Sequence, residues 1–280
     1  MTALALPAQR PSLAGRLAGR VRDVAVLTTR NFLHIRREPL RLSDVTIQPV
    51  LFTLLFVYVF GSGVKLPGGG NYTDFAIAGL LALNLTTGSI GTAVGLSSDL
   101  ATGVIDRFRS LAMWPAAVLV GRTLADLLTA MLCTAIVVAV GLVVGWTPGG
   151  SMLDTLAGLG VFLLFSYALS WMCACIGIMS RDSESAQGIG LIVLFPLSFV
   201  SNALVATQHM PAVLRTIADW NPVSAVTAAA RDLFHNPNPS AAIHAWPMEH
   251  PVLAALLWSV VLLGIFAPLA AWLYKRKTKE

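Results

Sequence analysis

Residues 116–146, AAVLVGRTLADLLTAMLCTAIVVAVGLVVGW, are the stretch that decides the fold class of this chain. A helix needs about 20 apolar residues to cross a hydrocarbon core of roughly 30 Å. This run is longer than that and contains only two charged residues, Arg122 and Asp126. The stretch therefore predicts a helix that crosses a membrane.

The composition of the whole chain indicates the same environment. Its 280 residues are 56% hydrophobic and 12% charged, with a mean hydropathy of +0.73. Soluble proteins carry about 25% charged residues, so we expect an all-α integral membrane protein with six transmembrane helices and no separate soluble domain. The six apolar runs lie approximately at residues 45–63, 75–97, 116–146, 153–178, 187–207 and 251–274.

The basic residues indicate the orientation of the chain. Sixteen of the 19 Lys and Arg residues lie before the first run, after the last run, or in and beside the loops on that same side. Because basic residues concentrate on the cytoplasmic side, we expect both termini in the cytoplasm of a bacterial cell and the chain in its plasma membrane. The net charge of +5 then reflects orientation and not a nucleic-acid partner. All three cysteines lie within apolar runs and are expected to be free thiols.

The region before the first run differs from the rest of the chain. Apolar residues recur there at helical spacing between arginines, which is typical of an amphipathic helix in the membrane interface. A solvated basic tail is the alternative. We expect a cytoplasmic N-terminal segment with this interfacial helix at 1–44, a six-helix transmembrane domain at 45–274 and a basic cytoplasmic tail at 275–280.

The stretch 208–250 is the longest connection, and it lies on the outer side. It is too polar to cross a membrane and too long for a loop without structure of its own. Asn221 and Pro222 supply a capping side chain and a proline for the first turn of a helix. We therefore expect two short helices broken at Trp220, Asn221 and Pro222, forming an outer re-entrant helical pair between spans five and six that packs against the bundle.

Several catalytic signatures do not occur in the sequence. It contains no Gly-x-x-x-x-Gly-Lys-Ser/Thr phosphate loop, no His-Glu-x-x-His and no Gly-x-Ser-x-Gly. The histidines match no metal-ligand spacing. We therefore assign no catalytic, cofactor-binding or metal-binding residue and expect a protein that is not an enzyme.

Polar and aromatic residues inside the spans are candidates for a structural or binding role. Arg122 and Asp126 stand one helical turn apart, which predicts an ion pair near the inner surface; a conformational or proton-carrying role for Asp126 is the alternative. A second set is expected to line an apolar, aromatic cavity, although packing or lipid contact would explain each residue singly. This set comprises Phe52, Phe56, Asn84, Phe165 and Phe199.

The cytoplasmic loop at 99–115 carries a recognisable pattern. The stretch Asp99-Leu-Ala-Thr-Gly-Val-Ile-Asp-Arg-Phe-Arg-Ser-Leu, with Pro115 and then Gly121-Arg122, resembles the cytoplasmic loop of type-2 ABC exporter permeases. That loop typically reads Glu-x-x-x-Gly-x-x-Glu-Arg before a Pro and a Gly-Lys/Arg, so Asp replaces the commoner Glu here. The start of the first span and the Asn221-Pro222 segment also resemble this family, and the likeness is greatest to its daunorubicin/doxorubicin resistance permeases.

This resemblance implies a dimeric permease, built from two identical copies or two related ones. Each copy would rest on a separate ABC ATPase subunit, which binds the ATP and Mg, through the loop 99–115 and the amphipathic helix before the first span. The cargo would be a hydrophobic drug-like compound, or alternatively a lipid or a lipid-linked glycan. A proton-driven secondary carrier using Asp126 is a third reading. The expected ATPase-coupling residues are Asp99, Gly103, Val104, Ile105, Asp106, Arg107, Phe108, Arg109 and Leu111.

Overall fold

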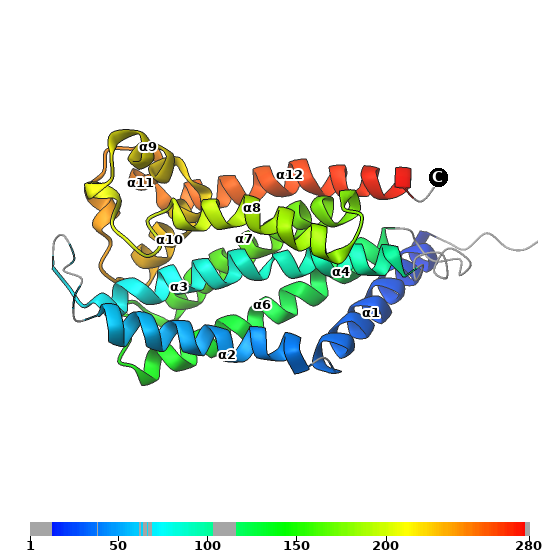
Figure 1. Ribbon diagram of the computed structural model, residues 1–280, viewed down its shortest axis with the longest axis horizontal. Helices are drawn as coiled ribbons and strands as arrows, with labels where there is room; N and C mark the ends of the chain where they lie inside the picture. Colours follow the sequence, from blue (N-terminus) through cyan, green and yellow to red (C-terminus); the bar gives the residue numbers. More distant parts are fainter. Residues whose placement is uncertain are drawn as a thin grey trace, which may run out of the picture.

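The computed structural model describes an elongated bundle of helices (Figure 1). The described residues are 13–37, 39–61, 63, 66, 69–102 and 116–277. Among them there is no β-strand. We call the end of the bundle that holds the start of α1 and the end of α12 the terminal end, and the opposite end, which holds α9 to α11, the cap end.

Most of the long helices run approximately along the bundle axis, whereas α1 crosses it obliquely (Figure 1). They are α1 (Leu13–Arg37), α2 (Pro39–Leu55) with a π-helical extension η1 (Phe56–Phe60), α3 (Tyr72–Gly88), α4 (Ile90–Ala101), α6 (Ala117–Val143), α7 (Met152–Met179), α8 (Ser183–Phe199) and α12 (Pro251–Lys277). The cap end holds η2 (Thr207–His209), α9 (Ala212–Trp220), α10 (Pro222–Leu233), η3 (Pro239–Ala242) and α11 (Trp246–Glu249).

Four helical stretches of the described chain are long and apolar enough to cross a membrane. They are Tyr72–Ala101, which joins α3 and α4, and then Ala117–Val143, Met152–Met179 and Pro251–Lys277. The first expected run forms a shorter apolar helix, Val45–Phe60. The fifth expected run, 187–207, is wrong at its end, because α8 stops at Phe199 and the next residues are not helical.

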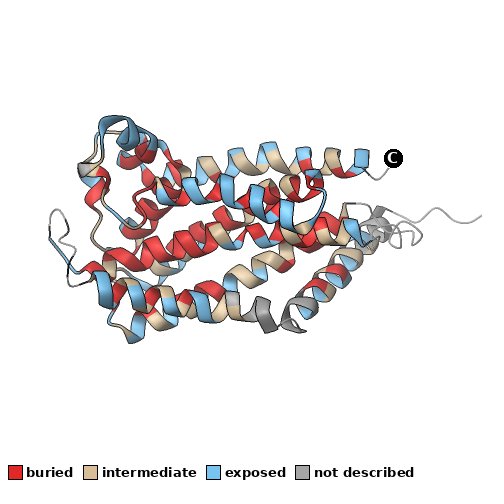
Figure 2. Cartoon of the chain, viewed as in Figure 1, coloured by how far each residue is buried: buried red, intermediate tan, exposed pale blue. Residues whose placement is uncertain are grey.

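Burial explains how these helices are layered. The stretch α3–α4 lies inside the bundle and packs against α6, α7, α8 and α10, and it is buried along most of its length (Figure 2). α12 packs along α7 but keeps most of its apolar surface exposed. An exposed apolar helix of this length suits a hydrocarbon solvent rather than water. The three cysteines are buried free thiols, as predicted.

The N-terminal helix is part of the bundle. α1 packs along α6, and Leu27 is 2% exposed in this contact. A Cβ added at Gly121 of α6 would lie 2.8 Å from Leu27 Cβ. The absence of a side chain at Gly121 therefore allows α1 to approach the α6 backbone closely.

Candidate functional site: a polar cavity and its anchors

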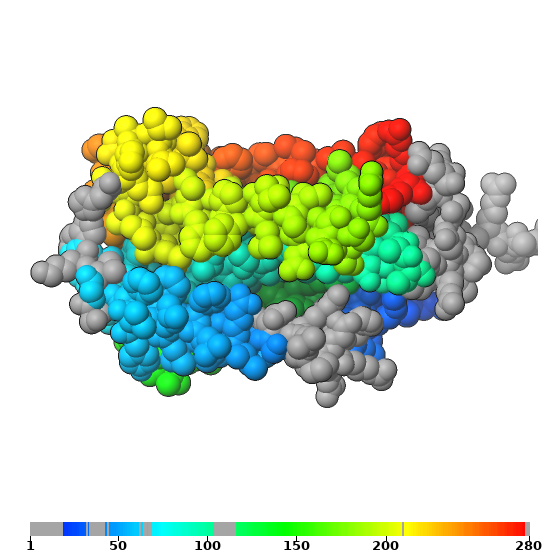
Figure 3. All heavy atoms as spheres, in the orientation of Figure 1, coloured from blue at the N-terminus to red at the C-terminus, as the bar shows by residue number. Residues whose placement is uncertain are grey.

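A cavity of about 430 Å³ lies among α2, α3, α4, α6, α7 and α8. Figure 3 shows the surface hollowed between α2 and α8, where atoms of α6 lie deeper. Polar side chains from all six helices contribute to its wall. They are Gln48, Asn84, Thr87, Ser89, Thr92, Arg122, Asp126, Thr129, Ser166, Ser170 and Gln187.

The cavity lies beside the interruption between α3 and α4. The helix is interrupted at Ser89, whose hydroxyl donates to Leu85 O at 2.8 Å. At Gly88 and Gly91, an added Cβ would meet no atom within 4 Å. These two glycines therefore border open space, which a larger side chain at either position would partly fill.

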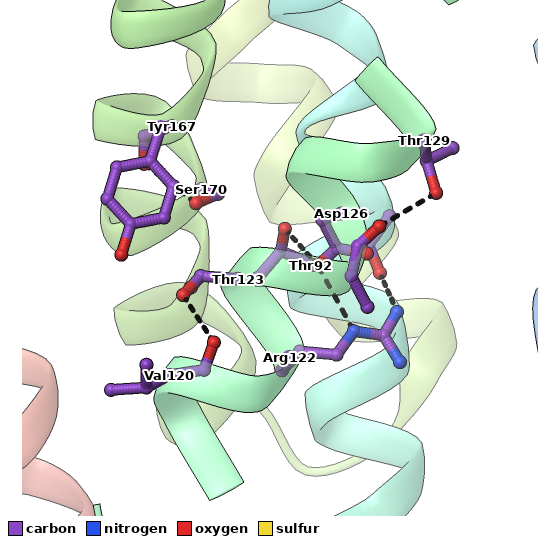
Figure 4. A network of polar contacts seen from close by, with 10 residues as sticks. Thr92, Val120, Arg122, Thr123, Asp126, Thr129, Tyr167 and Ser170 are labelled. Carbon is purple, nitrogen blue, oxygen red and sulfur yellow. Dashed lines mark hydrogen bonds and ion pairs between the residues drawn. The ribbon is translucent and has the colours of Figure 1, made fainter. Parts of the chain in front are cut away.

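The structure brings Arg122 and Asp126 together on α6 (Figure 4). Arg122 Nε donates to Asp126 Oδ2 at 3.1 Å, and Thr92 Oγ1 of α4 donates to the same oxygen at 2.7 Å. Arg122 Nη2 also donates to Gly91 O at 2.8 Å. The pair therefore joins α6 to α4, a link that the i to i+4 spacing alone does not reveal.

A glycine on α4 makes room for this pair. The Arg122 guanidinium lies directly over Gly95, where an added Cβ would overlap it. The side chains of Arg122 and Asp126 are 8% and 15% exposed. An unpaired carboxylate at the centre of a membrane helix costs about 2.5–3.5 kcal/mol, and the guanidinium and hydroxyl donors offset that cost.

The aromatic residues predicted to line a cavity do not line this one; of the predicted set only Asn84 does. Phe165 belongs to the core and is 1% exposed. The Phe52 and Phe56 rings have centroids 6.5 Å apart, and both residues pack against that core. Phe199 is half exposed and stacks on Phe195 with ring centroids 4.2 Å apart. A cavity-lining role for these four phenylalanines stays a prediction, because an apolar helix has no polarity difference that marks its cavity-facing side.

The expected coupling region is anchored at its first residue. Arg30 Nη2 of α1 lies 3.4 Å from Asp99 Oδ1 near the end of α4, with side chains 37% and 19% exposed. This ion pair joins the N-terminal helix to the helix that leads into the loop. The remaining expected coupling residues lie outside the described part of the chain. They are Gly103, Val104, Ile105, Asp106, Arg107, Phe108, Arg109 and Leu111.

At the cap end, α9 ends at Trp220 and α10 begins at Pro222. Asn221 caps α10, because its Oδ1 accepts from Val223 N at 2.8 Å. Its Nδ2 donates to Leu197 O and Val200 O at 2.8 and 2.6 Å. Asn221 therefore satisfies backbone groups at the start of one helix and at the end of α8.

Arg231 of α10 is a second buried polar side chain at the cap end, and the sequence analysis assigned it no role. It is fully buried, and its guanidinium donates to Phe75 O, Asn202 O and Ala203 O at 2.8–3.2 Å. Its Cζ lies 3.6 Å from the centroid of the Phe75 ring. Burial lowers the pKa of Arg231 to about 9, so it stays charged at neutral pH. The signal in the sequence was a single Arg in an alanine-rich helix.

The fold defines the chain as a helical membrane protein. Residues 22–235 match the family described as "ABC-2 type transporter". The chain belongs to the ABC-2 type transporter family and is a membrane permease, not itself an enzyme.

Three relatives illustrate this membership. The chain is 32% identical over 94% of its length to the daunorubicin resistance ABC transporter permease protein DrrB1 of Streptomyces coeruleorubidus, covering 91% of that protein. It is 22% identical to a probable doxorubicin resistance permease, DrrC, of Mycobacterium tuberculosis, over 91% of this chain and 89% of that one. It is 25% identical to the O-antigen export system permease RfbA of Klebsiella pneumoniae, over 76% and 81% of the two chains.

Proposed function

We propose that this chain is the membrane subunit of an ATP-driven exporter that moves hydrophobic, drug-like compounds out across the cell membrane. A separate ABC ATPase subunit binds and hydrolyses ATP with Mg, and this chain binds neither. The observation that carries the proposal is the 32% identity over 94% of the chain to a daunorubicin resistance permease.

In this proposal the chain crosses the membrane six times, with α2–η1 and α8 as the first and fifth crossings. The terminal end faces the cytoplasm, since 16 of the 19 Lys and Arg residues belong to that side. The cap end enters the outer leaflet, which is supported by the exposed apolar side chains of Val213, Ile217 and Trp220 on α9. The regions 1–44, 45–274 and 275–280 keep the roles expected from the sequence.

The ATPase contacts the loop 99–115 and the N-terminal segment, and two permease chains form the dimer. Contacts at both ends of α4 support transmission of movement from the loop to the cavity. Asp99 near one end pairs with α1, while Gly91 and Thr92 near the other bind the Arg122–Asp126 pair at the cavity. Force applied to the loop therefore moves a wall of the cavity.

Export of a lipid or a lipid-linked glycan is the second candidate. It is favoured by the similarity to an O-antigen export permease. A proton-driven carrier has less support. Asp126 Oδ2 already accepts from Arg122 and Thr92, so these contacts give Asp126 a structural role that joins α6 to α4.

The test uses the chain co-purified with a candidate ABC ATPase partner and reconstituted into proteoliposomes. We expect ATP-dependent doxorubicin transport that is lost when Asp106 and Arg107 are both replaced by Ala. Retained transport in that variant would contradict coupling through the loop. Transport of a lipid probe but not of doxorubicin would support the second candidate.

A further inference from the structure

We propose that the cavity recognises cargo by hydrogen bonds, so that each permease chain selects amphiphiles with hydroxyl, carbonyl or amine groups on an apolar frame. A hydrocarbon-like compound of the same charge is a poorer ligand. This inference rests on the proposed function, and it concerns the polar cavity described above.

The first support is a set of unused hydrogen-bonding groups. The side chains of Gln48 on α2, Ser166 on α7 and Gln187 on α8 line the cavity and have no hydrogen-bond partner among the described residues. Other hydroxyls in the wall already have partners: Thr87 donates to Leu83 O of its own helix at 2.8 Å, and Thr92 donates to Asp126. Three helices therefore present free donors and acceptors to one space.

The Arg122–Asp126 pair on α6 adds hydrogen-bonding groups from a fourth helix. Arg122 uses Nε and Nη2, and Asp126 uses Oδ2, whereas Arg122 Nη1 and Asp126 Oδ1 have no partner within the described chain. Because the two charges oppose each other, this part of the wall is dipolar and has no net charge. It recognises hydrogen-bonding groups on a ligand rather than the ligand's net charge.

The size and the remaining wall define the other part of the ligand. A volume of about 430 Å³ lies within the range of about 300–1,000 Å³ that is typical of small-molecule pockets. Leu85, Leu127 and Leu191 contribute apolar surface beside the polar groups. At membrane depth such groups need water or a polar ligand, and a cargo with both characters matches the whole wall.

The experiment uses Q48L, S166A and Q187L, made in the complete permease–ATPase complex. Each substitution removes a hydrogen-bonding group without breaking a hydrogen bond among the described residues. S259A is the matched control, because Ser259 is buried on α12, bonds Ala255 O at 2.8 Å and does not line the cavity. Equilibrium binding is measured for two cationic probes, doxorubicin, which carries hydroxyl and amino groups, and tetraphenylphosphonium, which has no hydrogen-bond donor.

We expect each variant to weaken doxorubicin binding about 3- to 10-fold, the worth of one neutral hydrogen bond. Tetraphenylphosphonium binding should change less than twofold, and S259A should change neither. Equal losses for both probes, no loss for either, or no binding of doxorubicin to the wild-type complex would overturn the inference. So would dissociation of the permease dimer in the variants, because the polar groups would then be subunit contacts.

Transport measured in parallel separates this inference from the proposed function. Selective loss of doxorubicin binding without ATP-driven transport by the wild-type complex would support the inference and contradict the proposed export of drug-like compounds. ATP-driven doxorubicin transport that is equally efficient in all variants would support the proposed function and overturn the inference.

Discussion

The substitution Arg231→Lys tests how the cap end is held together. Arg231 donates four hydrogen bonds from three nitrogens to three backbone carbonyls and covers the Phe75 ring. Lysine keeps the positive charge, and therefore the cost of burying it, but it places all its donors on one nitrogen. A single nitrogen cannot reach carbonyls that surround a planar guanidinium.

The magnitude follows from the bonds that are lost. We expect at least two of the four to disappear, and a hydrogen bond to a charged group contributes about 1.5–3 kcal/mol. The loss is therefore about 3 kcal/mol or more, before the weaker stacking on Phe75. At about 1.4 kcal/mol per factor of ten, the equilibrium for opening this region rises about 150-fold.

The assay is amide hydrogen exchange on the purified protein. The informative amides belong to the non-helical segment after α8. They are the backbone N–H groups of Val200, Asn202 and Ala203, which donate to Pro196 O, Ser224 Oγ and Ser201 Oγ in that order. We expect them to exchange about 150-fold faster in Arg231→Lys, while α12 amides keep their rates.

Arg215→Lys is the matched control, because Arg215 is exposed on neighbouring α9. It should leave exchange in the segment 200–206 unchanged. An increase in the exchange rate of less than about fivefold in Arg231→Lys corresponds to about 1 kcal/mol. Such a small increase would refute the argument that the Arg231 guanidinium stabilises the non-helical segment after α8.

Three further outcomes follow from the same contacts. Gly79→Ala should prevent correct packing, because a Cβ there overlaps the backbone of Ala203, whereas Gly88→Ala on the same helix meets open space; the yield of monodisperse protein distinguishes them. Asp99→Asn should change the unfolding free energy by less than about 1 kcal/mol, as expected for a partly exposed ion pair, but it should lower the amount of cargo moved per ATP hydrolysed. Burial raises the pKa of the Asp219 carboxyl, and the hydrogen bond from Thr207 partly offsets this rise. The folded cap therefore holds a proton on Asp219 more tightly than the unfolded chain does, and the cap becomes more stable as the pH falls. Asp219→Asn should remove that gain and slow exchange in α9 at neutral pH, and unchanged exchange would contradict this account.

The sequence was sufficient wherever local spacing or overall composition carried the information. The apolar runs and the low charge indicated a helical membrane protein, and the loop motif indicated the ABC-2 family, to which the chain belongs. The spacing of Arg122 and Asp126 indicated their pairing, because residues four apart share a helix face. Asn221 followed by Pro222 indicated the helix start at the cap, because both residue types have local backbone preferences.

Only the tertiary structure decided which faces of the helices meet. Arg231 bonds the carbonyl of a residue 156 positions away, and no local pattern links the two. The cavity combines polar groups from six helices, and of the residues expected to line a cavity it contains only Asn84. A helix that is apolar on every side has no amphipathic pattern to orient it, so the position of its few polar residues becomes informative only after the helices have packed.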